Sequence, residues 1–388
     1  MEYVKLEEIC TIVSGGTPSR SKPNYWNNGN IPWIKIKDMK SKYIDSAEEF
    51  ITEEGLNNYS TKMLKRGTIL YSIFATLGEV GILNIDACTN QAIAGLSLKE
   101  DSNILKEYLY YYLKSKKKDV NNLGRGVAQN NINLSLLRKF KIPVIPLCQQ
   151  KKIIEVLDNV SSTINNYERE LALLDELVKA RFVEMFGDPV TNDMLWNTDV
   201  LKDICTKIGS GSTPRGGKES YIDEGISLIR SMNVHNAYFE YKDLAHITLD
   251  QAEKLNNVVV EHDDLLFNIT GASVARCCVV PSDVLPARVN QHVCILRCRE
   301  KINPIFLQGL LVNENYQGKL LQIAKSGATR EAINKQQLES LEIMIPPLEL
   351  QNQFASFVQE IDKSRSRIQK SLEASQELFD SLMQEYFG

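Results

Sequence analysis

The sequence predicts an α+β fold with a pseudo-two-fold internal repeat, in which two similar mixed domains are each followed by one long helix. Three observations predict it. The stretch from Leu6 to Gly187 recurs as Leu201 to Gly388. The start of each copy contains short β-branched and aromatic runs broken by turn residues, and the end of each copy has apolar residues at helical spacing. We therefore expect mixed domains at residues 1–146 and 188–346, and helices at residues 147–187 and 347–388.

The two copies match motif by motif and in the same order. Leu6 to Cys10 returns as Leu201 to Cys205. The other repeated motifs are Gly15 to Pro18 with Gly211 to Pro214, Ile69 to Ser72 with Leu265 to Asn268, Asn90-Gln91 with Asn290-Gln291, Ile132-Asn133 with Ile333-Asn334, Pro146-Leu147 with Pro347-Leu348, Gln150 with Gln351, and Phe186-Gly187 with Phe387-Gly388. Solenoid repeats recur every 20 to 50 residues or so, so this longer period indicates two copies of one domain.

Composition limits the class of protein. A chain of 388 residues with 43% hydrophobic residues suits two or three globular domains. No apolar run approaches the roughly 18 residues of a membrane span, and the N-terminus does not resemble a signal sequence, so we expect a cytoplasmic protein with no membrane association. The eight cysteines show no Cys-x-x-Cys spacing and the four histidines are scattered singly, which predicts buried thiols and no metal site.

The repeated helices have apolar residues at alternating spacings of three and four, which predicts a coiled-coil seam. At 1.5 Å per residue each helix would be about 60 Å long, too long to bury its apolar stripe against one small domain. We therefore expect the helices to pair, antiparallel because Gly187-Asp188-Pro189 signals a chain reversal. Two unrelated helices on separate cores are the alternative. The predicted seam comprises Ile153, Leu157, Val160, Ile164, Leu171, Leu174, Val178, Phe354, Val358, Ile361, Ile368, Leu372, Phe379 and Leu382.

The mixed domains are predicted to contain short strands and one helix each. Strand-like runs include Ile31 to Ile36, Thr68 to Phe74, Ile226 to Ile229 and Asp264 to Ile269. The single helices are expected at the same point of the repeat, at Ile104 to Lys116 and at Pro304 to Ala324.

Two short motifs imitate enzyme signatures. Asn303-Pro304-Ile305-Phe306 resembles the tetrapeptide of adenine methyltransferases, but Ile305 breaks the pattern and no glycine-rich cofactor loop lies upstream. Asn303 is better explained as a helix N-cap, with Pro304 at the first helical position. Ser212 to Glu219 resembles a phosphate loop but lacks its first glycine and its final Ser or Thr. We therefore expect a binding protein with no catalytic residues.

Local charge suggests a nucleic acid as the ligand. The net charge of −4 and the pI of about 5.8 argue against a nonspecific polyanion binder. Basic residues nevertheless dominate the stretches from Arg20 to Lys42 and from Lys106 to Lys152, and the second copy has basic residues at corresponding places. Arg, Lys, Asn and Gln can bond base edges or phosphates. An ordinary solvated face is the alternative.

The order of these motifs, repeated twice, resembles the specificity (S) subunit of type I restriction-modification enzymes. Each copy opens with Leu-x-x-Ile-Cys and a Gly-x-Thr-Pro loop, continues with Ile-Asn, Pro-Leu and Gln, and ends in a long helix with Phe-Gly. The resemblance covers the whole chain. It implies that residues 1–146 and 188–346 are target recognition domains 1 and 2, and that residues 147–187 and 347–388 are conserved coiled-coil segments.

The resemblance also implies a function and partners. Each target recognition domain would read one half of a split double-stranded DNA site, while the coiled coil would set the spacer and dock two methyltransferase (M) subunits. Up to two restriction (R) subunits would join them. S-adenosylmethionine, ATP and Mg would belong to those partners, with no cofactor in this chain. Because the domains diverge at Thr76 to Cys88 and Thr270 to Arg288, we expect an asymmetric site.

The candidate DNA-binding residues are polar and lie on loops that differ between the copies within a shared apolar frame. They are Thr17, Ser19, Arg20, Lys22, Lys35, Lys37, Lys40, Arg125, Gln129, Asn130, Thr213, Arg215, Lys218, Arg230, Asn233, His235, Asn268, Arg276 and Arg330. Three other readings remain open: the specificity subunit of a related bifunctional restriction enzyme, a free-standing DNA methyltransferase, and a structural coiled-coil protein.

Overall fold

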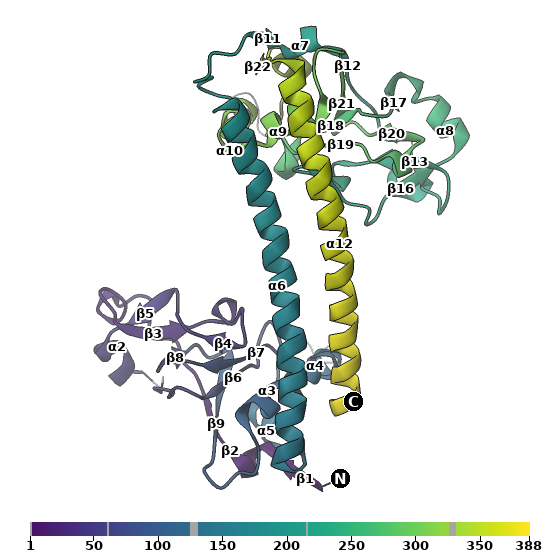
Figure 1. The fold of residues 1–388 in the computed structure, drawn as a ribbon. Coiled ribbons are helices and arrows are strands. Elements are labelled where there is room, and N and C mark those ends of the chain that lie inside the picture. Colours follow the sequence, from purple (N-terminus) through teal and green to yellow (C-terminus); the bar gives the residue numbers. More distant parts are fainter. Residues whose placement is uncertain (1, 60–61, 125–130, 215, 326–330) are drawn as a thin grey trace. The chain divides into compact units, whose positions relative to one another are not determined.

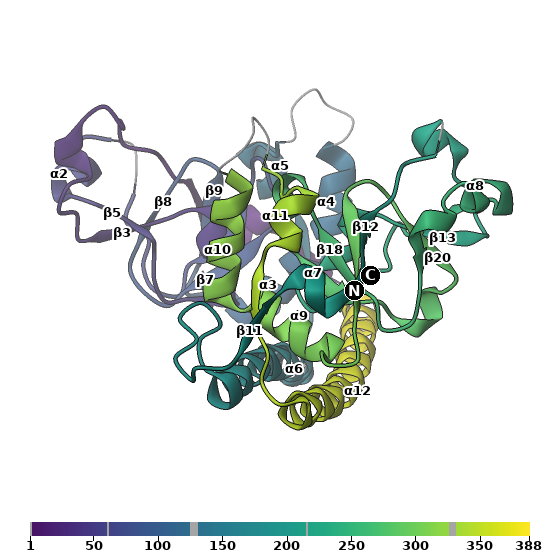
Figure 2. The same cartoon turned by 90° about the horizontal axis from the view of Figure 1, so that it is seen from above.

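The chain folds into two compact units, shown in the computed structural model of Figures 1 and 2. The structure describes residues 2–59, 62–124, 131–214, 216–325 and 331–388. The first unit comprises residues 1–167 and 371–388, and the second unit comprises residues 168–370. Each unit therefore contains one mixed domain and a segment of each long helix.

The first mixed domain contains ten strands and five short helices within its described residues. Its strands are β1 (Glu2–Lys5), β2 (Cys10–Ser14), β3 (Ile31–Ile34), β4 (Tyr43–Ile44), β5 (Glu49–Ile51), β6 (Ile69–Ser72), β7 (Val80–Leu83), β8 (Cys88–Thr89), β9 (Ile93–Leu98) and β10 (Lys141–Val144). Its helices are α1 (Leu6–Ile9), α2 (Glu53–Asn57), α3 (Lys106–Ser115), α4 (Lys117–Gly124) and α5 (Leu134–Arg138).

Two sheets form the centre of this domain. One has the order β2-β9-β6-β7-β4 and the other the order β5-β3-β8. Alternate residues of β6 face opposite sides, as the two-residue period of a strand requires. Ile69 and Tyr71 pack with α3 and the adjacent ends of the long helices, whereas Leu70 packs toward the second sheet with Ile34. The sheets are thus stabilised by burial on both faces.

The second mixed domain repeats this plan. Its strands are β11 (Thr198–Val200), β12 (Cys205–Ser210), β13 (Ile226–Ile229), β14 (Val234–His235), β15 (Tyr238–Phe239), β16 (Ala245–Ile247), β17 (Val259–Val260), β18 (Leu265–Asn268), β19 (Cys277–Val279), β20 (Ala287–Val289), β21 (Val293–Cys298) and β22 (Glu342–Met344). Its helices are α7 (Leu201–Ile204), α8 (Leu249–Glu253), α9 (Pro304–Val312), α10 (Glu314–Lys325) and α11 (Lys335–Glu339).

The sheets of the second domain repeat the central strand order of the first, but the first sheet lacks a counterpart of β4 and the second sheet gains β17 at its edge. Their orders are β12-β21-β18-β19 and β16-β13-β20-β17. On β18, Leu265 and Phe267 pack toward α9, α10 and the long helices, and Leu266 packs toward the other sheet. The predicted duplicated α+β fold is therefore confirmed.

One expectation about the mixed domains is wrong, because each domain has two consecutive helices at the point where one helix was predicted. The range predicted in the first domain corresponds to α3 and is followed by α4, whereas the range predicted in the second domain is divided into α9 and α10. In the first domain α3 ends at Ser115 and α4 begins at Lys117. In the second domain Asn313 adopts an extended conformation, and its side-chain oxygen accepts hydrogen bonds from the backbone N–H groups of Asn315 (3.0 Å) and Tyr316 (3.4 Å). Asn313 thus ends α9 and caps α10, a competition with helix continuation that is characteristic of Asn.

The long helices are α6 (Leu147–Phe186) and α12 (Leu348–Phe387). In the second unit Phe182 of α6 packs edge-on against Phe354 of α12, with ring centroids 5.5 Å apart, and Arg365 donates to Asp175 at 2.6 Å. Residue numbers rise along one helix as they fall along the other, so the segments run antiparallel. In both units the predicted seam residues are buried or half-buried, in contrast to most of their helical neighbours.

A buried glutamine fastens the start of each long helix to its mixed domain. Gln150 Oε1 accepts from the backbone N–H of Leu105 at 2.8 Å, and its Nε2 donates to the carbonyls of Asn103 (2.8 Å) and Ile145 (2.9 Å). Gln351 repeats this network in the second unit. Its partners are the N–H of Asn303 (2.9 Å) and the carbonyls of Lys301 (3.3 Å) and Pro346 (2.8 Å).

The turn after α6 depends on a glycine. Gly187 has a φ of +75°, and a Cβ there would lie 2.2 Å from Oδ1 of Asp193. The reversal is closed by Trp196, whose indole N–H donates to the carbonyl of Phe186 at 3.0 Å. Only glycine combines this backbone conformation with the close approach of Asp193.

Across the described ranges, no helix is long and apolar enough to cross a membrane.

Candidate nucleic-acid interface

In each domain a side-chain hydrogen bond joins the threonine of the Gly-x-Thr-Pro loop to the glutamine of the Asn-Gln loop. We call this contact the threonine–glutamine clasp. Thr17 Oγ1 donates to Gln91 Oε1 in the first domain, and Thr213 Oγ1 donates to Gln291 Oε1 in the second. The backbones approach so closely that a Cβ on the first glycine of the second loop, Gly211, would lie 1.7 Å from the carbonyl oxygen of Val289. This repeated contact explains the repeated motif as a structural frame.

In the second domain a polar pocket of about 530 Å³ lies beside this frame. Thr270 and His292 both line it, with Thr270 Oγ1 lying 2.6 Å from His292 Nδ1. Gln291 of the clasp continues this chain of hydrogen bonds, because its Nε2 lies 3.2 Å from His292 Nε2. The lining residues are Ser231, Met232, His235, Thr270, Gly271, Ala272, Ser273, Arg276 and His292.

His235 and Arg276 also line this polar pocket. The His235 ring stacks on Tyr238 with centroids 4.6 Å apart, and its Nε2 lies 3.2 Å from the carbonyl oxygen of Met232. Since a carbonyl only accepts, Nε2 carries the proton and Nδ1 is an acceptor. Arg276 Nη1 donates to that Nδ1 at 3.4 Å. The pocket therefore offers donors and acceptors held in place by stacking and hydrogen bonds.

In the first domain three of the predicted basic residues, Arg20, Lys35 and Lys37, form ion pairs within the domain. Arg20 Nη2 donates to Glu49 Oε2 at 2.5 Å, and its guanidinium lies 3.6 Å from the centroid of the Trp26 ring. Lys35 pairs with Glu49, and Lys37 pairs with Glu48. These carboxylates neutralise much of the charge that the sequence suggested for this face.

Three further predicted residues of this loop region have local bonds or none within the described residues. Lys22 Nζ donates to the hydroxyl of Tyr25 at 3.0 Å. Ser19 Oγ lies 2.9 Å from Ser21 Oγ, and Ser19 is exposed. Lys40 is also exposed, and no hydrogen bond or ion pair joins it to the described residues. Their contact with DNA stays a prediction.

The ion pairs around Glu49 give a pH prediction. Burial raises the pKa of Glu49, but hydrogen bonds from Lys35 and Arg20 outweigh it and leave the pKa below its ordinary value. A lowered carboxyl pKa contributes stability that is present above the unfolded pKa, about 4.3, and is lost as pH falls through the folded pKa. The wild type should therefore lose more thermal stability than Glu49→Gln when melting is followed by circular dichroism from about pH 6 to about pH 3. Glu53→Gln, at an exposed glutamate of the same domain, should follow the wild type; coincident curves for all three would contradict the expectation.

The side chains of two predicted DNA contacts are buried inside the second domain and used by the fold. Asn233 is 0% exposed; its Oδ1 accepts from the N–H of Arg230 at 3.0 Å and its Nδ2 donates to the carbonyl of Glu240 at 2.9 Å. Asn268 is also 0% exposed and donates to the carbonyl of Ser231 at 2.9 Å. Both asparagines hold backbone turns, a common use of a buried amide.

Of the remaining predicted residues, Arg230 bonds within its own domain, and the side chains of the others lie outside the part of the chain that the structure describes. The Arg230 guanidinium donates to the carbonyl of Asp243 and lies 5.5 Å from the ring centroid of Tyr221. Those outside the described residues are Arg125, Gln129, Asn130, Arg215 and Arg330, together with the side chain of Lys218.

Sequence reasoning missed the acidic partners and most of the residues that line the pocket. Glu48 and Glu49 follow shortly after the basic stretch from Arg20 to Lys42, and this proximity was the available signal for ion pairing. His292 follows the repeated Asn-Gln pair where the first copy has Ala92, and this difference could have marked it as a variable residue on a fixed frame.

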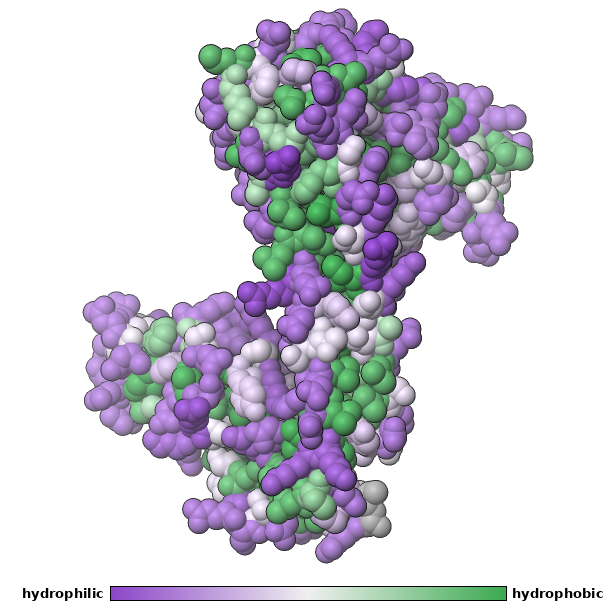
Figure 3. Space-filling view, viewed as in Figure 1, coloured by the Kyte–Doolittle hydropathy of each residue, from purple (hydrophilic) through white to green (hydrophobic). Residues whose placement is uncertain are grey.

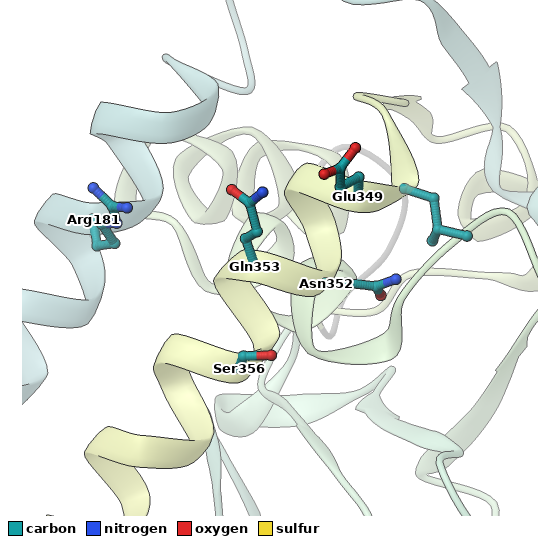
Figure 4. A pocket seen from close by; sticks show the side chains of 6 residues that line it. Arg181, Glu349, Asn352, Gln353 and Ser356 are labelled. Carbon is teal, nitrogen blue, oxygen red and sulfur yellow. The ribbon is translucent and has the colours of Figure 1, made fainter.

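Two features that imitate catalytic or ligand sites have structural explanations. Asn303 is an N-cap, as expected, since its Oδ1 accepts from the N–H of Ile305 at 2.9 Å and of Phe306 at 3.4 Å. A hollow of about 720 Å³ lies away from the recognition loops, and Figure 4 shows Arg181 of α6 and polar residues of the first turns of α12 around it. Arg181 is paired with Glu184 at 2.8 Å.

In the described ranges, no three His, Cys, Asp or Glu side chains gather in a way that could hold a metal ion.

The protein has two copies of one α+β domain, and each copy is followed by a long helix. Polar loops lie on the same scaffold in both copies. This architecture defines a protein with two binding domains. The chain belongs to the family of the type I restriction modification DNA specificity domain, whose model matches residues 1–175 and 194–376. The predicted resemblance is therefore confirmed.

Individual relatives agree with this assignment. The MjaIX specificity subunit of Methanocaldococcus jannaschii is 26% identical over 98% of this chain and 90% of that protein. The EcoR124I/EcoR124II specificity subunit of Escherichia coli is 32% identical, over 47% of this chain and 46% of that protein, so this match spans about half of each.

Solved structures share the fold. The S subunit of the type I restriction-modification system from M. genitalium has a TM-score of 0.60 and 15% identity, covering 100% of this chain and 96% of that one. A chain from a structure of type I complex assembly and conformational transition has a TM-score of 0.58 and 17% identity, covering 100% and 97%. By its family match the chain is a specificity subunit of the type I class, and such subunits are not catalytic.

Proposed function

We propose that this specificity subunit recognises a bipartite double-stranded DNA site, with one half read by each mixed domain. The observation that carries the proposal is the repeated threonine–glutamine clasp surrounded by different side chains in the two copies. A common frame allows both domains to meet DNA in the same way, whereas different polar groups on it select different bases. The site is therefore asymmetric.

Equivalent positions on the two frames differ in charge. The carbonyl of Glu79 accepts from the N–H of Ser72 at 2.9 Å, and the carbonyl of Arg276 accepts from the N–H of Asn268 at 2.8 Å, so the two residues occupy the same place. Glu79 is paired with Lys117 at 2.6 Å. A carboxylate and a guanidinium at one position favour different base edges.

The long helices supply a surface for partner subunits. Figure 3 shows hydrophobic residues gathered along the part of α6 that belongs to the second unit, where Leu173, Leu177 and Val183 are 56%, 46% and 47% exposed. Val183 also lines a mainly apolar hollow of about 640 Å³, which is formed by residues of α6, α9, α10 and α12. Exposed apolar patches of this kind mark protein interfaces. We assign this surface to one of two methyltransferase subunits, with restriction subunits joining the same complex.

The cofactors belong to the partners in this proposal. S-adenosylmethionine would be bound by the methyltransferase subunits, and ATP with Mg by the restriction subunits. A cytoplasmic location follows from the same proposal, because the complex acts on chromosomal DNA.

Mapping of methylated adenines tests the proposal. The chain is co-expressed with its cognate methyltransferase subunit in a host that lacks other adenine methylation, and modified positions are found by single-molecule sequencing. We expect one motif made of two different short sequences separated by a gap of fixed length and free sequence. Methylation without sequence preference, or at one continuous or palindromic motif, would exclude it.

A further inference from the structure

We propose that Arg276, positioned by His235, is a specificity-determining residue that donates to a guanine edge in the half-site of the second domain. The inference rests on the proposed function and names the contact that one pocket makes. Arginine is the side chain that most often reads guanine, by paired donation to O6 and N7 in the major groove.

The first support is the unused bonding capacity of Arg276. Its guanidinium carries five N–H donors, and one hydrogen bond, from Nη1 to Nδ1 of His235, engages it within the described part of the chain. Across the same residues it forms no ion pair, in contrast to Arg20, Lys35 and Lys37 of the first domain. Arg276 lines the open polar pocket with the remaining donors available for a ligand.

The second support is the way His235 holds this guanidinium. His235 is fixed on one side by stacking on Tyr238 and on the other by its bond to the carbonyl of Met232. The ring therefore presents Nδ1 to Arg276 as a fixed acceptor. An arginine oriented before binding loses less side-chain entropy when it donates to a base.

The third support separates a base contact from a phosphate contact. Both domains meet the same sugar-phosphate backbone, so a phosphate anchor should have the same charge in both copies. At this position the copies have Glu79 and Arg276, which are opposite in charge. A residue that differs between the copies in this way fits base reading, because the two half-sequences differ.

The test compares methylation maps of Arg276→Ala, Arg276→Lys and wild type, each assembled with the cognate methyltransferase. The wild-type motif should contain a G·C pair in one half-site, and at that pair both variants should lose discrimination against other bases by roughly tenfold to a hundredfold. The other half-site should be unchanged. Arg299→Ala, at an exposed arginine of the same domain away from the pocket, should leave the motif intact.

The Lys variant distinguishes the two kinds of contact. Lysine keeps the positive charge but lacks the planar guanidinium that donates two parallel hydrogen bonds to guanine. If Arg276 contacts a phosphate, binding would survive in Arg276→Lys. In that case Arg276→Ala would weaken binding equally on all sequences, and the salt dependence of binding would become smaller. That result would overturn the inference, as would unchanged discrimination in both variants or a wild-type motif without a G·C pair in either half. If wild type gives no bipartite motif at all, the proposed function itself fails.

The role of His235 as a positioning residue has its own readout. His235→Ala should reduce discrimination at the same base pair as Arg276→Ala, whereas His235→Gln should restore part of it, because the glutamine amide oxygen can accept from Arg276. The melting temperature of each variant, measured on the full chain, should match wild type. Loss of discrimination at a different position, or equal defects in the Ala and Gln variants, would contradict the assignment.

Discussion

Adding seven residues to α6 after Tyr167 and seven to α12 after Lys370 should change the gap of the DNA site and leave both half-sequences intact. Each helix passes from one unit into the other at these points, so the insertions alter neither mixed domain. Copies of residues 161–167 and 371–377 would preserve the seam in both helices. Seven residues lengthen a helix by about 10 Å, which corresponds to about three base pairs.

Methylation mapping of the doubly extended chain measures this result. A motif with the same two half-sequences and a gap longer by about three base pairs is the expected outcome. The control inserts seven residues in α6 alone, so the contacts between α6 and α12 on the two sides of the insertion cannot all stay in register, and methylation should fall sharply. Altered half-sequences at a constant gap would show that the helices do not set the spacing.

Replacing Gln351 by alanine should destabilise the second unit by about 3 kcal/mol, since it leaves one N–H and two carbonyl groups buried without partners. Gln351 is 0% exposed, and all three of its bonds join the start of α12 to the mixed domain. For a unit of about 200 residues, this change lowers the melting temperature by roughly 6–12 °C.

Differential scanning calorimetry of the full chain checks this expectation. Gln353→Ala is the matched control, because Gln353 lies on the same helical turn but is exposed. Gln150→Ala should have the same effect on the first unit, where the network is the same. Equal melting temperatures for Gln351→Ala and Gln353→Ala would show that the bonds add little to stability.

The sequence allowed the architecture to be predicted because its signals are local or repetitive. The three-and-four spacing from Ile153 onward needs no knowledge of the partner helix, and the Asn303-Pro304 cap depends on neighbouring residues alone. The break between α9 and α10 was missed because it depends on the competition of one Asn313 side chain with the helix.

The candidate site was predicted less well, because charge and polarity along a chain do not indicate which groups meet. Lys35 and Arg20 looked like DNA contacts, yet Glu49 from a neighbouring strand bonds both. Asn233 and Asn268 looked accessible, and both are buried. Arg276 was named among many candidates, but its relation to His235, 41 residues away, could not be inferred from spacing.

The sequence by itself determined the duplication, the long helices and the family, since motif order and apolar periodicity are properties of the chain. Only the tertiary structure decided which polar side chains form hydrogen bonds or ion pairs within their own domain and which face an open pocket. The physical reason is that a hydrogen bond or an ion pair requires two groups within about 3 to 4 Å, and residues distant in the sequence reach that separation only when the sheets pack.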